Sequence, residues 1–445
     1  MAKDDDKKIS RPSLNKITQE DKNSFNEVCD RYQKFLSAAQ TPHLAVQEIM
    51  KQAEKQQFSG YTPDAASDTF YITNEDQTNI ALVRKGTDSF TEGIRIIGAH
   101  VDSPCLTAKV HPIREKPEGV MLDCYPYGGI YFHQWFDTAV NVIGHCVKNG
   151  KNISFELNGL IADSTIHFSG RDRMKKQYED AFEAESLDVF IGFKDKDEFL
   201  AHMKDEHDIT EEDFARSMLT IVPKIAPYRI SEHYMAGFGH DDRVCAFGGL
   251  HAITQSAAPK KTSVLLVFDR EEIGSTGYNG ANSRFLEHVI DIIARTEDVD
   301  LTDVQMRQMF AKSQMISADV DVAFNSNDAS YSQEESASKF GEGLIMDRFN
   351  GGANQSYGNN VPLTLVDRYM NLFKKYDIQF KVSAIPPKVN TGGGGTIAMY
   401  FAHRGIPVVD MGIPVLSMHG KYPTIFLPDF FQMLKGYKVF FEEDF

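Results

Sequence analysis

The sequence predicts an α/β fold into which a second, β-rich module is inserted. A short apolar run, Val264–Phe268, has the β-branched and aromatic composition of a buried strand, and charged residues follow it at once. Strand-like runs alternate with helical patterns near the N-terminus and through the C-terminal half. Between Pro104 and about Phe238 the pattern changes to short strand signals separated by Gly, Asn and Asp, which indicates a separate module.

The composition is that of a globular protein long enough for more than one domain. The chain has 445 residues, of which 42% are hydrophobic and 25% charged, and a formal net charge of −16. It has no long Lys/Arg-rich run, so nucleic acid is not an expected partner. The five cysteines form no CxxC motif, and the N-terminus lacks a signal-peptide core. No stretch approaches the roughly 20 apolar residues of a membrane span. We therefore expect a cytoplasmic protein with no membrane partner.

The N-terminal region predicts two helices followed by strands. Apolar residues recur at helical spacing from about Gln19 to Ala39. A second helix is expected to begin at Thr41-Pro42, because Thr is a favoured cap and Pro a favoured first helical residue. Short strands are expected near residues 69–73 and 80–84.

The next strand, Ile94–His100, ends in His-Val-Asp. Residues two apart on an extended chain lie on the same face, so His100 and Asp102 can converge. A metal-bound histidine commonly has a carboxylate on its far ring nitrogen, which makes this pair a plausible ligand and its orienting group. The alternative is a surface histidine beside an aspartate.

The run Val264–Phe268 delivers Glu271 and Glu272 to the end of a strand, where open α/β sheets carry their sites. Adjacent residues there point in different directions, so one Glu can bind a metal while the other handles a proton. The alternative is an acidic solvated loop. Asp241 precedes a helical segment at residues 244–253 and would place a carboxylate in the same layer, although helix capping also explains an acidic residue there.

The remaining segments predict helices at residues 284–295, 301–312, 363–376 and 430–441, and strands at 378–384 and 406–412. Asp319 follows a short apolar piece, and His419 follows the last strand. The glycine run Thr391–Thr396 precedes a short helix and presents N–H groups to an anion or a carbonyl oxygen, or is only a tight turn. It lacks the Gly-Lys-Ser/Thr ending of a nucleotide loop, so ATP is not an expected ligand.

The insert carries one histidine of interest. His167 lies in STIHFSG, an alternating pattern typical of a strand, and a structural role is the default for it. The charged stretch Arg171–Glu212 predicts a loop and an exposed helix.

Candidate metal ligands lie at strand ends or ahead of a helix, and all fall outside the insert: His100, Asp241, Glu272, Asp319 and His419. Two histidines and three carboxylates suit zinc, manganese or cobalt. Five ligands exceed what one catalytic zinc takes, whereas two ions about 3.5–4 Å apart that share a carboxylate would use them all. Such a pair would activate a hydroxide and polarise a carbonyl, with Glu271 as general base. The sequence has no HExxH or GxSxG motif, and no GxGxxG follows a strand.

Five motifs in this order resemble the M18 family of zinc aminopeptidases: GAHVDSP, GHDDRVCAF, FDREEIGSTG, SADVD and LSMHG, between residues 98 and 420. The stretches NSNDASYSQEES and TGGGGTIAMYFAHRGIPVVDMG are more similar to the aminopeptidase I branch than to the aspartyl aminopeptidase branch. The resemblance implies a hydrolase that releases N-terminal amino acids from peptides.

The resemblance also implies roles for the ligands. Asp241 would bridge two divalent ions, most simply zinc, with cobalt or manganese as alternatives. His100 and Asp319 would complete the shell of one ion, and Glu272 and His419 that of the other.

Further roles follow for residues that do not bind metal. Glu271 would be the general base, and Asp102 would orient His100. His167 falls where the family places a histidine that reaches a neighbouring subunit's active site. We also assign Gly393 and Gly394 of the glycine run to the substrate pocket as a hypothesis.

The family implies a discontinuous catalytic domain, residues 1–103 and 239–445, with a mixed sheet and helices on both faces. Residues 104–238 would form an inserted β-rich dimerisation domain, and the dimers would assemble into a tetrahedral homododecamer.

Two departures bear on the substrate. Gly351–Asn360 has no Lys or Arg, and His133–Asn141 lacks the Arg-Asp pair of the aspartyl branch. We therefore expect peptides with neutral or hydrophobic N-terminal residues, with acidic residues as the second option. The alternatives are a deacylase or dipeptidase reaction at the same two-metal site, or a non-catalytic metal-bound shell.

Overall fold

The computed structural model describes residues 9–63, 67–352, 356, 358–384 and 393–445. Its contacts divide the chain into two compact units. The first, here called the sheet unit, comprises Met1–Asp102, Pro227–Met418 and Pro423–Phe445. The second, the barrel unit, comprises Ser103–Ala226 and His419–Tyr422. The functional assignment of residues 104–238 as an inserted dimerisation domain stays a prediction.

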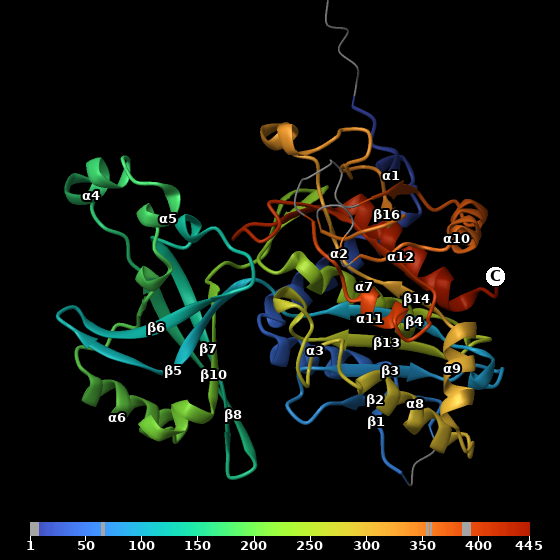
Figure 1. The fold of residues 1–445 in the computed structure, drawn as a ribbon, viewed down its shortest axis with the longest axis horizontal. Helices are drawn as coiled ribbons and strands as arrows, with labels where there is room; N and C mark the ends of the chain where they lie inside the picture. Colours follow the sequence, from blue (N-terminus) through green and yellow to red (C-terminus); the bar gives the residue numbers. More distant parts are fainter. Residues whose placement is uncertain (1–8, 64–66, 353–355, 357, 385–392) are drawn as a thin grey trace, which may run out of the picture. The chain divides into compact units, whose positions relative to one another are not determined.

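The sheet unit is built on a mixed sheet that has nine strands within the described residues (Figure 1). In spatial order these are β1 (Ser59–Gly60), β2 (Thr69–Thr73), β3 (Ile80–Arg84), β13 (Ser263–Phe268), β4 (Arg95–His100), β14 (Gln314–Ser317), β18 (Val408–Gly412), β16 (Leu344–Asp347) and β17 (Phe380–Ser383). Strands β13, β4, β14 and β18 are parallel to one another, whereas β3 and β16 run antiparallel to their neighbours β13 and β18. The predicted mixed α/β class is therefore confirmed.

Helices cover both faces of this sheet because its central strands are apolar on both sides (Figure 1). On β13, Leu265 and Val267 join one core with α2 (Asp21–Ala38), α3 (Pro42–Glu54), α7 (His240–Gln255), α10 (Leu363–Lys375) and α12 (Leu427–Glu442). Val264, Leu266 and Phe268 join the other core with α8 (Phe285–Thr296), α9 (Asp303–Lys312) and α11 (Ala398–Ala402). A short helix, α1 (Pro12–Asn15), precedes them.

Local sequence signals explain where several of these helices begin. Thr41 Oγ1 accepts a hydrogen bond from the Leu44 N–H (3.3 Å), and Pro42 is the first residue of α3, as predicted. At α9, Thr302 and Gln305 form a reciprocal capping box. These caps satisfy N–H groups that the helices themselves leave without a partner.

A smaller sheet also belongs to the sheet unit. Its order is β11 (Tyr228–Ser231), β12 (Tyr234–Ala236), β20 (Thr424–Phe426), β19 (Pro414–Leu416) and β15 (Asp321–Val322). Residues 227–238, which the sequence suggested would continue the insert, thus pair with the C-terminal region instead. Such a pairing depends on tertiary contacts that composition does not report.

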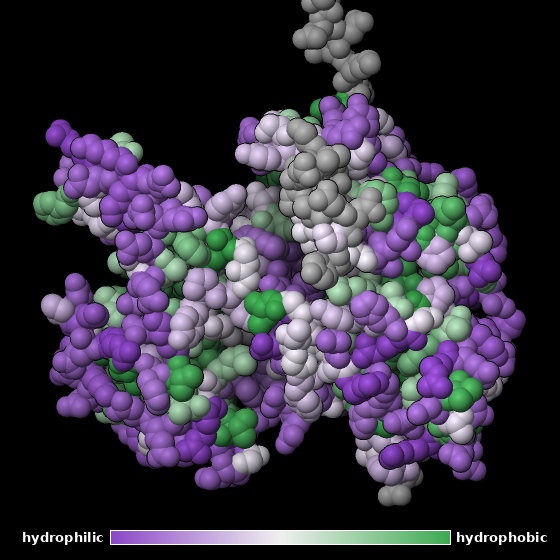
Figure 2. Space-filling model, in the orientation of Figure 1, coloured by the Kyte–Doolittle hydropathy of each residue, from purple (hydrophilic) through white to green (hydrophobic). Residues whose placement is uncertain are grey.

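The barrel unit is a closed barrel with the strand order β10 (Ser217–Pro223), β5 (Cys105–Lys116), β6 (Gly119–Tyr127), β9 (Val189–Phe190), β8 (Lys151–Ile161) and β7 (Thr138–Lys148). Closure pairs the strand edges that an open sheet would expose. Figure 2 shows that hydrophilic residues cover most of the visible surface of this unit. The charged stretch Arg171–Glu212 contains the predicted exposed helix, α6 (Lys196–His207).

The strand suggested by the alternation around His167 is wrong. The segment forms α4 (Ile166–Arg173), followed by α5 (Tyr178–Ala181). Ile166 and Phe168 are 71% and 88% exposed, so the alternation of residue types reflects no buried face.

Candidate metal centre

Three parallel strands of the sheet unit, β13, β4 and β14, end side by side (Figure 1). The register pairs Phe268 with His100, so the turn after β13 lies beside the end of β4. Asp319 follows β14 by two residues. The carboxyl ends of parallel strands therefore bring His100, Glu271, Glu272 and Asp319 to one edge, as the sequence predicted.

The imidazole of His100 is buried, and its two nitrogens have different surroundings. Its Nε2 lies 3.3 Å from Asp241 Oδ1, and 3.9 Å from both Glu271 Oε2 and Asp319 Oδ1. Its Nδ1 lies 3.2 Å from Asp102 Oδ1 and 3.1 Å from the Asp102 carbonyl oxygen. Burial alone lowers the pKa of His100, but the hydrogen bonds of Asp102, Asp241 and Asp319 raise it well above its usual value. Nε2 thus faces carboxylates, while Nδ1 is held by its contacts with Asp102.

Asp102 connects His100 to the turn that carries the two glutamates. Its Oδ1 accepts a hydrogen bond from the Glu271 N–H (3.1 Å), and its Oδ2 accepts one from the Glu272 N–H (3.1 Å). The sequence predicts only a contact between Asp102 and His100. The second role comes from the β4–β13 register, which places residues 101–102 beside residues 269–272.

Asp241 and Asp242 lie at the start of α7, where their backbone departs from helical angles and the peptide bond between them is cis. Gly239 precedes them with a φ of 84°, a conformation that favours glycine. Asp241 turns toward His100, whereas Asp242 Oδ2 accepts a hydrogen bond from the His100 N–H (3.4 Å). The two aspartates therefore do more than cap the helix.

The Glu271–Glu272 turn is held by groups that the sequence analysis did not identify. Asp269 accepts hydrogen bonds from the Arg270 N–H (2.8 Å) and from the Asn279 side chain (2.7 Å). The Tyr400 hydroxyl donates to the Gly274 carbonyl oxygen at 2.8 Å. Tyr400 lies within α11, the helix after the glycine run, and no sequence spacing relates it to residue 274.

The residues of the sheet unit fit a divalent metal ion. His100, Asp241 and Asp319 each offer a ligand atom within 4.8 Å of the others, and the oxygens of Asp241 and Glu272 lie within the same distance. Burial raises the pKa of Glu272 well above its usual range, and the charge of Asp241 raises it further; burial also raises the pKa of Asp319. Histidine nitrogen and carboxylate oxygen are ligands that zinc accepts. The carboxylates repel one another when they lie this close, and a divalent cation would offset that repulsion.

His419 is the first residue of His419–Tyr422, the part of the β19–β20 connection that belongs to the barrel unit. Its Nδ1 lies 3.0 Å from the Gly129 carbonyl oxygen, also in the barrel unit. A proton on Nδ1 that bonds this carbonyl would leave the lone pair on Nε2, the state in which a histidine binds metal. Its place among the metal ligands stays a prediction.

Three further predicted site residues, His167, Gly393 and Gly394, are exposed. His167 is exposed on α4 of the barrel unit. Gly393 and Gly394 are exposed in the sheet unit, and the Gly394 carbonyl oxygen accepts a hydrogen bond from the Gly351 N–H (3.2 Å). Thr391 and Gly392 lie outside the described residues.

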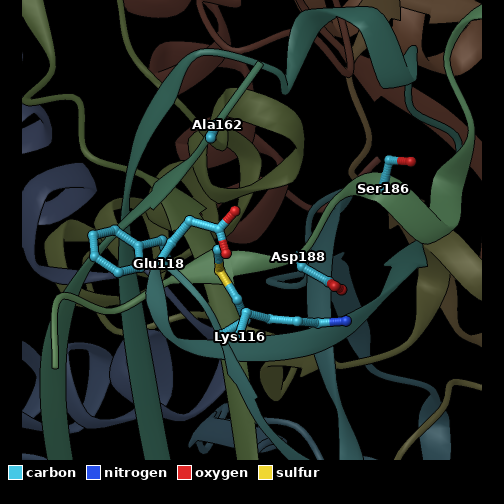
Figure 3. A pocket seen from close by; sticks show the side chains of 7 residues that line it. Lys116, Glu118, Ala162, Ser186 and Asp188 are labelled. Carbon is cyan, nitrogen blue, oxygen red and sulfur yellow. The ribbon is translucent and has the colours of Figure 1, made fainter. Parts of the chain in front are cut away.

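The barrel unit has a cavity of about 230 Å³ of a different character (Figure 3). Its lining includes Lys116, Glu118, Ser186 and Asp188. Lys116 extends along the side of the pocket on which Asp188 lies (Figure 3), and its charge lowers the pKa of that carboxyl against the larger effect of burial. Charges of both signs occur together here, unlike in the His100 group.

A mixed α/β sheet that gathers a histidine and carboxylates at its strand ends is the framework of a metallohydrolase. A family model described as aminopeptidase I zinc metalloprotease (M18) matches residues 35–441. The chain belongs to this family. It is thus a metal-dependent aminopeptidase, and the metal of its family is zinc.

Individual relatives agree with this assignment. A probable M18 family aminopeptidase 1 from Clostridium acetobutylicum is 28% identical over 439 residues, which cover 92% of this chain and 93% of that protein. The crystal structure of an M18 aminopeptidase from Thermotoga maritima matches with a TM-score of 0.89 at 26% identity, covering 98% of this chain and 100% of the other. The mApe1 dodecamer of S. cerevesiae shares the fold at a TM-score of 0.73 and 19% identity, covering 94% and 97%.

A search of the described helices for one long and apolar enough to span a bilayer finds none.

Proposed function

We propose that this enzyme releases single N-terminal residues from peptides by using two divalent ions. His100 and Asp319 would hold one ion, Glu272 and His419 the other, and Asp241 would bridge them. The observation that carries this proposal is the environment of His100, whose Nε2 faces Asp241 and Asp319 while Nδ1 is bound to Asp102. A histidine whose far nitrogen is fixed by a carboxylate is typical of a metal ligand.

Glu271 is our candidate for the general base. Its Oε2 lies 3.9 Å from His100 Nε2, and its backbone N–H is held by Asp102. Divalent ions in this centre would polarise the scissile carbonyl and make a water more acidic. Glu271 would take the proton of the attacking water and return it to the leaving amine. Asp102 would fix both the imidazole and the glutamate turn.

The glycine run would line the substrate side of the centre. Gly393 and Gly394 are exposed, and a Cβ added at Gly394 would meet no atom within 4 Å. The substitution Gly394→Val is therefore expected to leave the fold intact and to raise KM by crowding the substrate. An unchanged KM for peptides, measured beside an unchanged unfolding temperature, would refute this role for the run.

We further propose a homo-oligomer in which the barrel unit forms dimers that assemble into a tetrahedral dodecamer, and a cytoplasmic location. The assembly is supported by the family and by the exposed apolar residues Ile166, Phe168 and Met174 on and beside α4. The location is supported by five cysteines that are all free and buried. Light scattering of the purified protein would test the assembly, and a monomer at micromolar concentration would contradict it.

The activity is tested with a panel of aminoacyl-anilides and short peptides, with and without a chelator and with added Zn²⁺, Co²⁺ or Mn²⁺. We expect single N-terminal residues to be released, the release to stop with chelator, and metal to restore it. Protein that binds two ions but releases no residue with any metal would favour a deacylase or a non-catalytic shell instead.

A further inference from the structure

A second group of carboxylates lies next to the metal centre in the sheet unit. Strand β16 pairs with β18 so that Asp347 and Asp410 are directly opposite, and β18 pairs with β14 so that Asp410 lies opposite Ser317. Directly paired residues point to the same face of a sheet. Asp319, two residues beyond Ser317, raises the pKa of both Asp347 and Asp410 through its charge, after the larger effect of burial. The charge of the metal centre is therefore felt by the Asp347–Asp410 pair.

Asp410 and its neighbour Asp321 have hydrogen-bond donors. The Asn350 amide donates to Asp410 Oδ2 (2.8 Å), and the Thr396 hydroxyl donates to its Oδ1. The Ser338 hydroxyl donates to Asp321 Oδ2. These neutral donors explain how two buried carboxylates are accommodated.

Asp347 differs from them. It is 5% exposed, and among the described residues no group makes a hydrogen bond to its Oδ1. The nearest hydroxyl on the adjacent strand does not serve it, because Ser383, opposite Asp347 on β17, donates to the Ser336 carbonyl oxygen (2.7 Å). A buried carboxylate oxygen without a donor loses free energy unless a ligand supplies the partner.

The ligand that this group selects is a cation. Asp410 lies directly opposite Asp347 on β18. On the other side, the hydroxyl of its β17 partner Ser383 lies 3.3 Å from the Ser338 hydroxyl that bonds Asp321. Acidic groups therefore lie on both sides of Asp347, and the local potential is negative. The adjacent basic residues are engaged elsewhere: Arg348 donates to the Asn360 side chain, and Lys381 to Glu342 and to the Ala337 carbonyl oxygen. A negative, dehydrated site attracts an ammonium or guanidinium group and rejects a carboxylate.

The end of the glycine run contacts this group. Thr396, at its end, donates to Asp410, and Gly394 bonds the backbone of Gly351, the residue after Asn350. Gly393–Gly395 are exposed, and space is open at Gly394. The described end of the glycine run therefore lies beside the Asp347–Asp410 row.

We propose that Asp347 binds the charged end of a lysine or arginine side chain at the N-terminus of the peptide, so that the enzyme prefers basic N-terminal residues. This inference rests on the proposed aminopeptidase function and replaces the expectation of neutral or hydrophobic residues. Asp410 and Asp321 would strengthen the negative potential, while Asp347 would make the direct contact.

The test compares lysyl- and norleucyl-p-nitroanilide with the zinc-loaded full-length enzyme, because norleucine is lysine without its amino group. We expect kcat/KM to be about tenfold or more higher for lysine, the usual value of one hydrogen bond to a charged group. Asp347→Asn should remove most of this lysine-to-norleucine ratio. Asp291→Asn makes the same chemical change on the exposed surface of α8 and should keep the ratio.

Several results would overturn the inference. A lysine-to-norleucine ratio near one in the wild-type enzyme would refute the assigned contact. So would a ratio that Asp347→Asn leaves unchanged, as happens when turnover of both substrates falls equally. The lysine-to-norleucine ratio of the wild-type enzyme tests the proposed preference even if Asp347→Asn does not fold. Turnover of neither substrate would instead contradict the proposed aminopeptidase function, and the inference would fall with it, whereas turnover without lysine preference would refute the inference alone.

Discussion

The pKa of an acidic residue shifts in opposite directions in the metal centre of the sheet unit and in the barrel unit. In the barrel, Asp213 accepts the Thr210 N–H (2.9 Å) and lies 3.0 Å from Lys148 Nζ, so the pKa of its carboxyl falls to about 2. In the centre, burial raises the pKa of Glu271 to about 8, and the charges of Asp319, Asp102 and Asp241 add to the rise although His100 opposes it. Asp213 thus has a cationic partner within the chain, whereas the acidic residues of the centre gather round one imidazole.

The two regions differ in what stabilises their acidic residues. The barrel's charge pairs are complete within the polypeptide and serve stability and solubility. The centre's carboxylates repel one another and are stabilised by a divalent cation. Substitutions in either region test this difference.

The largest effect is expected for Glu271→Gln in the centre. Loss of a general base lowers kcat by about 10²- to 10⁴-fold, while the metal ligands remain in place. Metal content by elemental analysis and the unfolding temperature should match wild type. Hydrolysis at the wild-type rate would refute the assigned role, and loss of metal would show that Glu271 is a ligand instead.

A smaller effect is expected for Asp102→Asn. This change removes the charge on the far nitrogen of His100 and weakens the hold on the Glu271 and Glu272 N–H groups, so zinc affinity should fall by about 10- to 100-fold. Competition with a chromophoric chelator measures it. Asp269→Asn is the matched control, since Asp269 bonds Arg270 and Asn279 and has no hydrogen bond to the imidazole; an equal loss of affinity in both variants would contradict the special position of Asp102.

The smallest effect is expected in the barrel. Asp213→Asn weakens the capping box with Thr210 and the pair with Lys148, and should lower the free energy of unfolding by about 1 kcal/mol without changing kcat. Because the folded pKa of Asp213 is depressed, its contribution is fully present above the unfolded value of 3.8 and is lost as pH falls through about 2. Denaturant unfolding at neutral pH measures the loss, with the exposed Asp205→Asn as control. An equal loss in the control would show that the effect is not specific to the pair.

Much of the fold and of the site followed from local sequence signals. The run Val264–Phe268 is β13, the Thr41-Pro42 signal starts α3, and the pattern at Ile94–His100 is β4. Because parallel strands end at one edge, the same signals placed His100 near Glu271 and Asp319. Periodicity and caps are local properties, so a single sequence reports them.

The features that the sequence did not predict depend on contacts between distant segments. Asp347 and Asp410 become neighbours only through the antiparallel register of β16 and β18. The second role of Asp102 arises from the register of β4 and β13, and α4 replaces a strand because its alternating residues are not half-buried. Register between strands far apart in the sequence is fixed when their buried faces pack together, and the local pattern of one strand does not identify its partner.

A zinc titration of the metal-free enzyme, followed by the rate of hydrolysis of one aminoacyl-anilide, tests the two-metal centre directly. We expect no turnover without metal and a rate that rises until about two equivalents of zinc are bound per chain. Full activity in the metal-free protein, or a plateau at one equivalent with no further binding, would contradict it.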